Sequence, residues 1–142
     1  MAIGWIGANT VAAIGHRFGW YTLPFGVAVF GTFIVNLGAI LAQVATSQNA
    51  HASKILDINQ EQFLVDTGLY GKVRHPFYSG FCVMIMFWPI ALGSLWGLPL
   101  ALLLCAGLVV RIHFEEDLLL KGMVGYENYQ SRVKYKLIPR IY

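Results

Sequence analysis

Ionisable side chains gather in two short stretches of this sequence, one on each side of a long apolar run. The first stretch contains Arg74 and His75, and the second contains Arg111 and Glu115. Such residue types can bind a carboxylate or phosphate, hydrogen-bond a polar ligand, or move a proton. A simpler explanation is that Arg74 and His75 flank a membrane span and that Arg111 pairs with Glu115 one helical turn later. Whether the two stretches can act together depends on how the chain between them folds.

The composition predicts a membrane protein. Hydrophobic residues make up 57% of the 142 residues and charged residues only 12%, whereas an ordinary soluble domain carries about 25% charged residues. The net charge of +3 then fits contact with anionic lipid headgroups better than contact with nucleic acid. We therefore expect one domain over residues 1–142 that contacts membrane lipids and binds no nucleic acid.

Two windows without Asp, Glu, Lys or Arg are long enough to hold membrane spans. The first window contains one predicted span, residues 23–46. The second, residues 76–110, is too long for one helix and is interrupted by prolines and glycines, which break helices. It predicts a tight helical hairpin made of residues 77–92 and 95–113. The sequence therefore predicts an all-α integral membrane protein with three or four transmembrane helices.

The hairpin returns the chain to the side of the membrane from which it entered. The two ionisable stretches must therefore lie on one face, where a water-soluble reactant can meet a lipid-like one. By the positive-inside rule this face is cytoplasmic. Nine of the ten Lys and Arg residues belong to it, and only Arg17 lies opposite; the nine are Lys54, Lys72, Arg74, Arg111, Lys121, Arg132, Lys134, Lys136 and Arg140.

The remaining segments carry weaker signals. Residues 1–15 form either a short span or a helix along the surface, and residues 49–72 form a loop or an interfacial helix. The amphipathic tail from residue 118 supplies candidate interfacial anchors, namely Tyr126, Tyr129, Tyr135 and Tyr142. Its basic stretch, residues 134–140, is expected to contact anionic lipid, although it could also close over a bound cofactor.

Several other polar residues are expected to play no part in chemistry. Glu116 and Asp117 are expected to be solvated neighbours of Glu115. Cys82 and Cys105 lie in apolar runs, which indicates small buried hydrophobes. The sequence predicts no metal site, because the histidines are irregularly spaced and have no cysteine partner nearby; they are His16, His51 and His113.

Four motifs in order resemble one enzyme family. The run LVDTGLYGKVRHPFYSG, an apolar hairpin, RIHFEEDLLL and GYENYQSRVKYKLIP are similar to the isoprenylcysteine carboxyl methyltransferase family and its bacterial relatives. Phospholipid methyltransferases share the general pattern. The resemblance covers about residues 55–140, and it implies methyl transfer from S-adenosylmethionine, which leaves S-adenosylhomocysteine, without a Rossmann domain. It is consistent with the absence of a GxGxxG motif from this sequence.

The resemblance also implies roles for individual residues. Arg111 and Glu115 match the essential Arg and Glu of the family and would be catalytic. Position 62 is often His in the family and is Gln here. The residues that match cofactor contacts are Gln62, Phe63, Leu64, Val65, Tyr70, His75, Pro76, Phe77 and Tyr78.

The chemistry of methyl transfer suits these residue types. The methyl donor is already activated, so the protein mainly supplies positioning and electrostatics. A carboxylate acceptor needs a cation to hold it, and the Arg111 guanidinium can do this. An amine acceptor would instead need a base, for which Glu115 or Glu116 is available. The apolar hairpin could form a groove for an acyl or prenyl chain; the simpler reading of its large side chains is lipid exposure or helix packing.

The favoured function is carboxyl O-methylation of a lipophilic, isoprenylcysteine-like or prenylated substrate at the cytoplasmic face of the membrane. Three alternatives remain: N-methylation of a phospholipid or other amine, a membrane reductase that uses NADPH, and a non-catalytic lipid-binding protein. The oligomeric state is not encoded in any recognisable feature of the sequence.

Overall fold

The protein is all-α. The computed structural model describes residues 2–19, 23–49 and 64–142, without the side chains of residues 2–5, 8 and 16, and contains no strand in that part. Five helices are present there: α1 (Ala2–Arg17), α2 (Phe25–Gln48), α3 (Pro76–Ala91), α4 (Leu98–Gly122) and α5 (Tyr126–Arg132).

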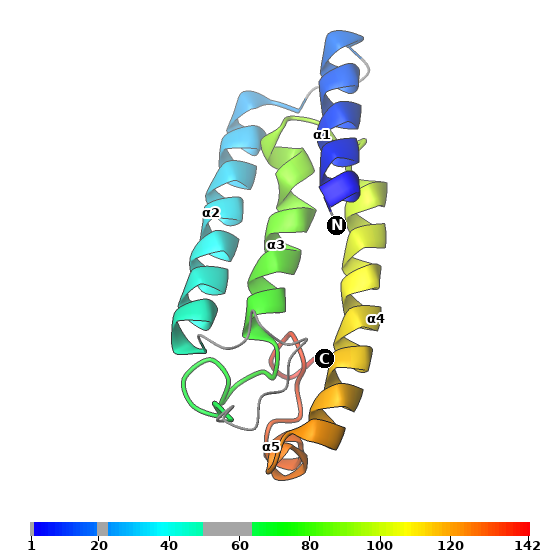
Figure 1. Ribbon diagram of the computed structural model, residues 1–142. Coiled ribbons are helices and arrows are strands. Elements are labelled where there is room, and N and C mark those ends of the chain that lie inside the picture. Colours follow the sequence, from blue (N-terminus) through cyan, green and yellow to red (C-terminus); the bar gives the residue numbers. More distant parts are fainter. Residues whose placement is uncertain (1, 20–22, 50–63) are drawn as a thin grey trace.

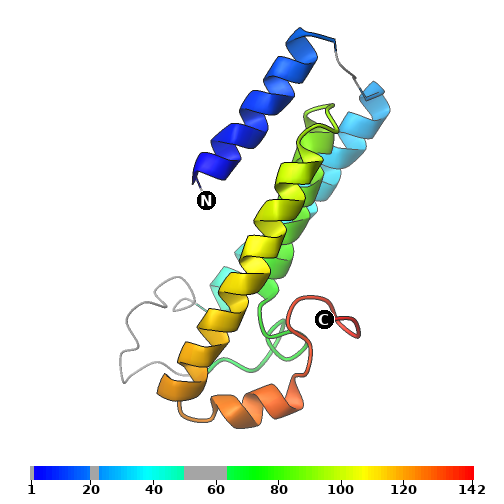
Figure 2. The ribbon, with the colours of Figure 1, turned by 90° about the vertical axis from the view of Figure 1, so that its right-hand side faces the viewer.

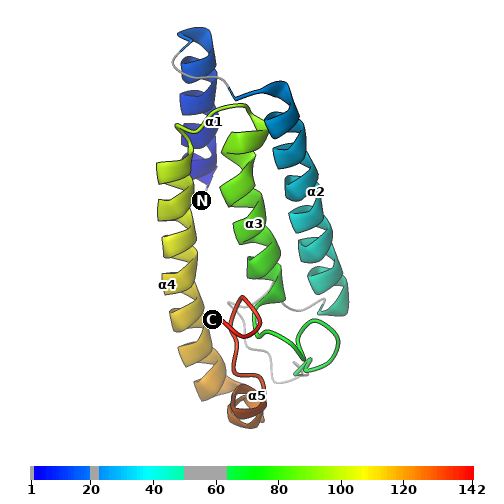
Figure 3. The same ribbon diagram turned by 180° about the vertical axis from the view of Figure 1, so that it is seen from behind.

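Three helices form a layer with α3 in the middle. Helices α2, α3 and α4 run side by side in both the front and the rear view (Figures 1 and 3). Seen from the side, α1 is inclined to this layer and lies at the end opposite α5 (Figure 2). Helix α1 is fastened to the hairpin by a hydrogen bond of 3.1 Å from the Trp88 indole to the Asn9 side chain. Residues 2–15 thus belong to a helix that contacts the hairpin.

Small residues allow α2 and α3 to pack closely. A Cβ atom added at Gly80 would lie 2.6 Å from the carbonyl oxygen of Gly38 and 2.7 Å from the amide nitrogen of Ala42. Only glycine fits at such a contact, and rows of small residues are a common way for membrane helices to approach one another. The close α2–α3 contact fixes the position of the first turn of α3, where the polar residues begin.

The helical hairpin predicted from the sequence is present, with two differences at its ends. The predicted break begins at Pro89, yet this residue lies within the last turn of α3, where it is fully buried. The turn itself follows Ala91 and uses Gly93 with a φ of +72°, a conformation that suits glycine. Helix α4 continues beyond the predicted end at residue 113 to Gly122, because no proline or glycine lies between these two positions. Arg111 and Glu115 therefore lie inside a helix.

Two helices are long and apolar enough to cross a membrane. They are α2, with 24 residues and a mean hydropathy of 2.1, and α4, with 25 residues and a mean hydropathy of 1.7. The apolar helix α3 has 16 residues, which correspond to about 24 Å of helix, somewhat less than a hydrocarbon core of about 30 Å. These lengths and compositions fit the predicted all-α membrane protein.

The segments outside the layer gather at one end of the molecule. The loop before α3, the helix α5 and the segment 133–142, which we name the C-terminal segment, lie where α3 begins and α4 ends (Figure 1). Tyr126 and Tyr129 in α5 are only 3% and 2% exposed, so the prediction that they are interfacial anchors is wrong. They pack against Leu64, Leu119, Met123 and Val133 instead.

Candidate active site

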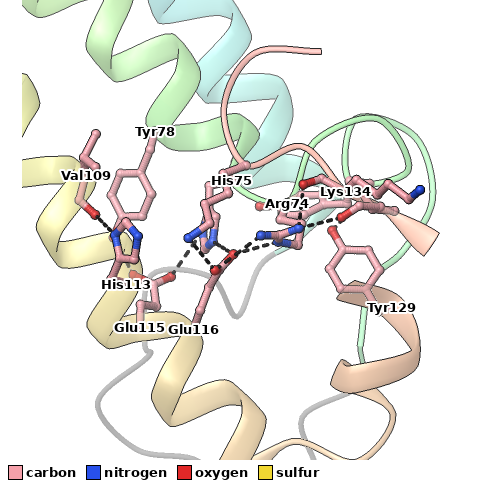
Figure 4. Close-up of polar contacts among 12 residues, drawn as sticks. Arg74, His75, Tyr78, Val109, His113, Glu115, Glu116, Tyr129 and Lys134 are labelled. Atoms are coloured by element: carbon pink, nitrogen blue, oxygen red, sulfur yellow. Dashed lines mark hydrogen bonds and ion pairs between the residues drawn. The ribbon is translucent and has the colours of Figure 1, made fainter. Parts of the chain in front are cut away.

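Arg74 and Glu116 form a buried ion pair at the centre of the polar end. The Arg74 Nε lies 2.6 Å from the Glu116 Oε1, and its Nη2 lies 3.3 Å from Oε2. Both side chains are only 5% exposed. Figure 4 shows the guanidinium between Glu116 on one side and backbone carbonyl groups on the other. A buried charge pair of this kind is tolerated only when its remaining hydrogen-bonding groups are also satisfied.

Two further side chains donate hydrogen bonds to the Glu116 carboxylate. The His75 Nε2 lies 3.1 Å from Oε1 and the Lys136 Nζ lies 3.0 Å from Oε2. Because a carboxylate only accepts hydrogen bonds, the proton of the imidazole must be on Nε2 in this arrangement. Glu116 therefore receives four donors, two on each oxygen, and has little capacity left for a ligand. The expectation that Glu116 is a solvated neighbour is wrong.

The C-terminal segment is hydrogen-bonded directly to these residues. The Arg74 Nη1 donates to the carbonyl oxygens of Val133 and Lys134, at 2.7 and 2.9 Å. The amide groups of Arg74 and His75 donate to the carbonyl oxygens of Tyr135 and Lys136, both at 2.9 Å. The expected contact of residues 134–140 with anionic lipid is thus wrong for Lys136, whose ammonium group binds Glu116. This segment holds the polar end together.

Arg111 and Glu115, the two predicted catalytic residues, are connected through Tyr78. The Tyr78 hydroxyl donates to the Glu115 Oε2 at 2.8 Å and accepts from the Arg111 Nε at 2.9 Å. No direct ion pair between Arg111 and Glu115 occurs in the described part of the chain. Glu115 is 7% exposed and Arg111 is exposed. The terminal nitrogens of Arg111 form no hydrogen bond to the described residues and can bind an anion.

The two neighbouring carboxylates therefore differ in what they can do. Among the described residues, Tyr78 alone donates a hydrogen bond to Glu115. The Oε1 of Glu115 is 3.8 Å from the His75 Nδ1, which is longer than a hydrogen bond. The Glu115 carboxylate keeps lone pairs that a ligand or a proton can use, whereas those of Glu116 are occupied.

The hairpin brings together the residues that the sequence places on one face. His75, Tyr78 and Glu115 lie together in this cluster (Figure 4). Arg111 joins them through its hydrogen bond to the Tyr78 hydroxyl. Pro76 is buried and occupies the first turn of α3, where proline is preorganised for a helix start.

The other residues predicted to contact a cofactor form no side-chain hydrogen bond within the cluster or lie outside the described part. Gln62 and Phe63 are outside the described residues, and Leu64 and Val65 are half-buried. Phe77 is 37% exposed and stacks on Phe81. Tyr70 is buried, and its carbonyl oxygen accepts a hydrogen bond from the Tyr129 hydroxyl at 2.8 Å.

Sequence reasoning placed Arg74 in the first ionisable stretch but gave it and Lys136 no role in the site, and it treated Glu116 as a solvated neighbour. A signal was present for Glu116. Successive residues of a helix point about 100° apart, so the pair Glu115–Glu116 can be buried only where α4 is covered on two sides. One cover is α3, and the second is the C-terminal segment, whose docking the sequence does not reveal.

A buried hydroxyl next to this cluster has no partner. The oxygen of the Tyr126 side chain is inaccessible and forms no hydrogen bond to the described residues. Burial raises the pKa of Tyr126, and the charge of Glu116 raises it further, so the hydroxyl stays protonated at neutral pH. An unmatched buried donor costs free energy, and a bound polar ligand is one way to satisfy it.

No group of three metal-ligating side chains lies together in the described part of the chain. His113 is exposed, and its Nδ1 lies 2.8 Å from the carbonyl oxygen of Val109 in its own helix (Figure 4).

Helices α2 and α4 are long and apolar enough to cross a membrane, and a buried ionic cluster lies at one end of the layer that contains them. This arrangement fits an integral membrane protein. The chain belongs to the phospholipid methyltransferase family, whose profile matches residues 26–123. No curated protein gives a significant match. The match spans α2, α3 and α4 with every member of the cluster except Lys136. The family makes the chain a membrane methyltransferase and confirms the resemblance seen in the sequence.

Proposed function

We propose that the protein transfers a methyl group from S-adenosylmethionine to the polar head of a lipophilic acceptor at the end of the molecule that carries Arg111 and Glu115. The observation that carries the proposal is the Arg111–Tyr78–Glu115 chain of hydrogen bonds, because it presents a cation with free donors and an anion with free lone pairs side by side. The family match supports the reaction class.

The donor set fits this cofactor. S-adenosylmethionine carries a sulfonium, an amino group and a carboxylate, so its site needs both an anion and a cation. Glu115 and Arg111 supply them, the ring of Tyr78 offers an aromatic face, and the hydroxyl of Tyr126 offers an unused donor. His75 is held by Glu116 and keeps its Nδ1 free of a close partner. When bound, the cofactor supplies an activated methyl group on sulfur.

A carboxylate is the first candidate for the acceptor group, as in an isoprenylcysteine. The carboxylate is already nucleophilic, so the protein needs only to hold it in line with the methyl group. The terminal nitrogens of Arg111 can do so with a two-pronged contact. Tyr78 fixes the guanidinium through Nε, which leaves the free edge of Arg111 for the acceptor.

An amine is the second candidate, as in a phospholipid headgroup, and the family description favours it. A protonated amine must lose a proton before it can attack. Glu115 is the carboxylate that could accept it, because the oxygens of Glu116 are already occupied. In this case Arg111 would bind the phosphate of the same headgroup.

The proposal places the polar end in the cytoplasm. The described basic residues outside α1 lie in or near this end, whereas Arg17 terminates α1 at the opposite end (Figure 1). The positive-inside rule then orients the chain. Labelling of single cysteines from either side of a vesicle would test the orientation.

Binding of S-adenosylhomocysteine to the purified protein in nanodiscs tests the proposal, and calorimetry gives the affinity. Glu115→Gln and Arg111→Ala should abolish methyl transfer while the melting temperature stays near that of the wild type. Asp117→Asn is the matched control, because Asp117 is an exposed acid on the same helix, and it should retain activity. No binding at millimolar concentration would refute the proposal. A thermal shift with NADPH alone would indicate a reductase, and no response to either cofactor would indicate a non-catalytic protein.

The acceptor group can be identified from the product. After transfer of a tritiated methyl group into a membrane extract, treatment with mild base releases methanol from an ester but leaves a methylated amine intact. Volatile label would support the carboxylate, and label that stays with the lipid would support the amine.

A further inference from the structure

A groove outside the ionic cluster opens on the surface between α2 and α3. Its volume is about 270 Å³, and most of its lining is apolar. The lining residues are Ala39, Ala42, Gln43 and Thr46 from α2, and Phe77, Phe81 and Met84 from α3.

The side chains explain why a groove forms here. The side chains of Ala39 and Ala42 are single methyl groups, so α2 fills little space between the helices here. The facing part of α3 carries large side chains. The rings of Phe77 and Phe81 stack with their centroids 6.0 Å apart at 13° and form one wall. Met84, which has a flexible side chain, also lines the groove, farther from the polar end. Such a wall accommodates a flexible apolar chain, because methionine and stacked rings present smooth, adaptable surfaces.

The groove runs from the polar end toward the middle of the layer. Thr46 is near the last turn of α2 and Phe77 is in the first turn of α3, and both turns are at the polar end (Figure 1). Ala39 and Met84 are seven residues farther along their helices, which corresponds to about 10 Å. A molecule in the groove would have one end near the polar cluster and the other among the apolar side chains.

The groove and the ionic cluster are neighbours around α3. The ring of Phe77 meets the ring of Tyr78 edge-on, with centroids 5.6 Å apart at 68°. Tyr78 is the residue that joins Arg111 to Glu115. One ring therefore separates the wall of the groove from the hydrogen bonds of the site.

We infer that the groove binds one hydrocarbon chain of the lipid acceptor while the head of the same molecule lies at Arg111 and Glu115. The inference rests on the proposed function and adds the place where the acceptor is held. The hydrocarbon chains of the acceptor must stay out of water. This groove is apolar, begins at the polar end of the molecule and lies next to Tyr78. A packed helix of a second copy fits less well, because close approach of helices needs small residues on both sides, and Phe77 and Phe81 occupy this side of α3.

Photo-crosslinking tests the inference. The protein would be placed in phosphatidylcholine nanodiscs that contain phosphatidylethanolamine with a diazirine on one acyl chain. After illumination, we expect labelled peptides from Phe77, Phe81 or Met84 and from the facing part of α2. Ala39→Leu fills the groove and should lower this labelling about tenfold, since the lost contact is that of a few methylene groups. Ala28→Leu is the matched control, because Ala28 is a partly exposed alanine three turns away on the same side of α2.

The outcomes separate this inference from the proposed function. Ala39→Leu should also raise the KM for the lipid acceptor about tenfold, with kcat and the affinity for S-adenosylhomocysteine unchanged. Suppose that methyl transfer persists while the photo-crosslinks are spread evenly over the membrane-facing helices, or while Ala39→Leu leaves them unchanged. Either result would overturn the inference about the groove and leave the proposed function standing. In a separate experiment, oxidation of a Phe81→Cys variant that links two copies of the chain through this position would overturn the groove in favour of a dimer contact. If the wild-type protein does not bind S-adenosylhomocysteine, the proposed function itself is refuted.

Discussion

The hydroxyl of Tyr78 joins Arg111 to Glu115: it accepts a hydrogen bond from the arginine at 2.9 Å and donates one to the carboxylate at 2.8 Å. Arg111 and Glu115 are one turn apart on α4 and could pair directly, yet the bridge from α3 separates them. The arrangement ties the two helices of the hairpin together and leaves both charged groups with unused hydrogen-bonding capacity.

Removal of this bridge should impair catalysis more than folding. Tyr78→Phe keeps the ring and deletes the hydroxyl, so Arg111 and Glu115 are free to pair and cover each other. We expect turnover to fall by a factor of about 100, in the range seen when a positioning group is lost, and stability to fall by about 1 kcal/mol. Steady-state methyl transfer and a thermal melt measure the two effects. Tyr129→Phe, which also deletes a buried hydroxyl bond, should lower stability while turnover stays within about twofold; equal losses of turnover in both variants would contradict the assignment.

Loss of the Glu116 charge should affect stability first. Glu116→Gln leaves Arg74 buried and opposite a neutral group, which costs about 3 kcal/mol or more. The exposed neighbour offers the comparison, because Asp117→Asn should change stability by less than about 0.5 kcal/mol. Unfolding in detergent with increasing denaturant gives both values. A Glu116→Gln protein as stable as Asp117→Asn would show that the buried network contributes nothing to the fold.

The two tyrosines of α5 should respond to loss of their hydroxyls in opposite ways. The Tyr129 hydroxyl donates to the carbonyl oxygen of Tyr70, whereas that of Tyr126 has no partner in the described part of the chain. Tyr129→Phe should destabilise the protein by about 1 kcal/mol, and Tyr126→Phe should stabilise it by a similar amount. If Tyr126 contacts the cofactor, the second variant also weakens S-adenosylhomocysteine binding. Melting temperatures with and without that ligand distinguish the effects, and a destabilised Tyr126→Phe protein would be the contrary result.

A methyl group at the tightest helix contact should weaken the layer. Gly80→Ala places Cβ against the backbone of Gly38 and Ala42, so α2 and α3 must separate, at a cost of about 1–3 kcal/mol. The control is Gly26→Ala on α2, where an added Cβ meets no atom within 4 Å, and it should be neutral. Thermal melts of the two variants suffice, and equal melting temperatures would argue against this packing.

Alkaline pH should destabilise the polar end. Burial is the largest cause that raises the pKa of Tyr70, Tyr126 and Tyr129 above the ordinary value of 10.0. A group whose pKa is raised in the folded state stabilises the fold below the unfolded pKa, and this contribution is lost as pH rises above it. We expect the melting temperature to fall above about pH 10, with tyrosinate absorbance appearing together with unfolding. Full ionisation of all tyrosines at pH 10 in the folded protein would contradict this.

The sequence was sufficient to predict the hairpin and the meeting of His75 with Glu115. Both follow from hydropathy and from the helix-breaking residues near Gly93, which act locally. The roles of Glu116, Tyr126 and Tyr129 were predicted wrongly, because their burial depends on the docking of residues 133–137 against Arg74, a contact between segments far apart in the chain. A C-terminal stretch rich in basic and aromatic residues has the same sequence pattern whether it contacts lipid or packs against protein. The Tyr78 bridge was likewise beyond reach, since it depends on the rotation of α3 relative to α4.

The docking of residues 133–137 on Arg74 and His75 also sets an order of events during synthesis. Helices α2, α3 and α4 precede these residues in the chain. The guanidinium of Arg74 can bind the carbonyl groups of Val133 and Lys134 only after those residues have been synthesised. Until then the cation of Arg74 lacks these two acceptors. The polar end therefore reaches its described arrangement only after residues 133–137 have left the ribosome.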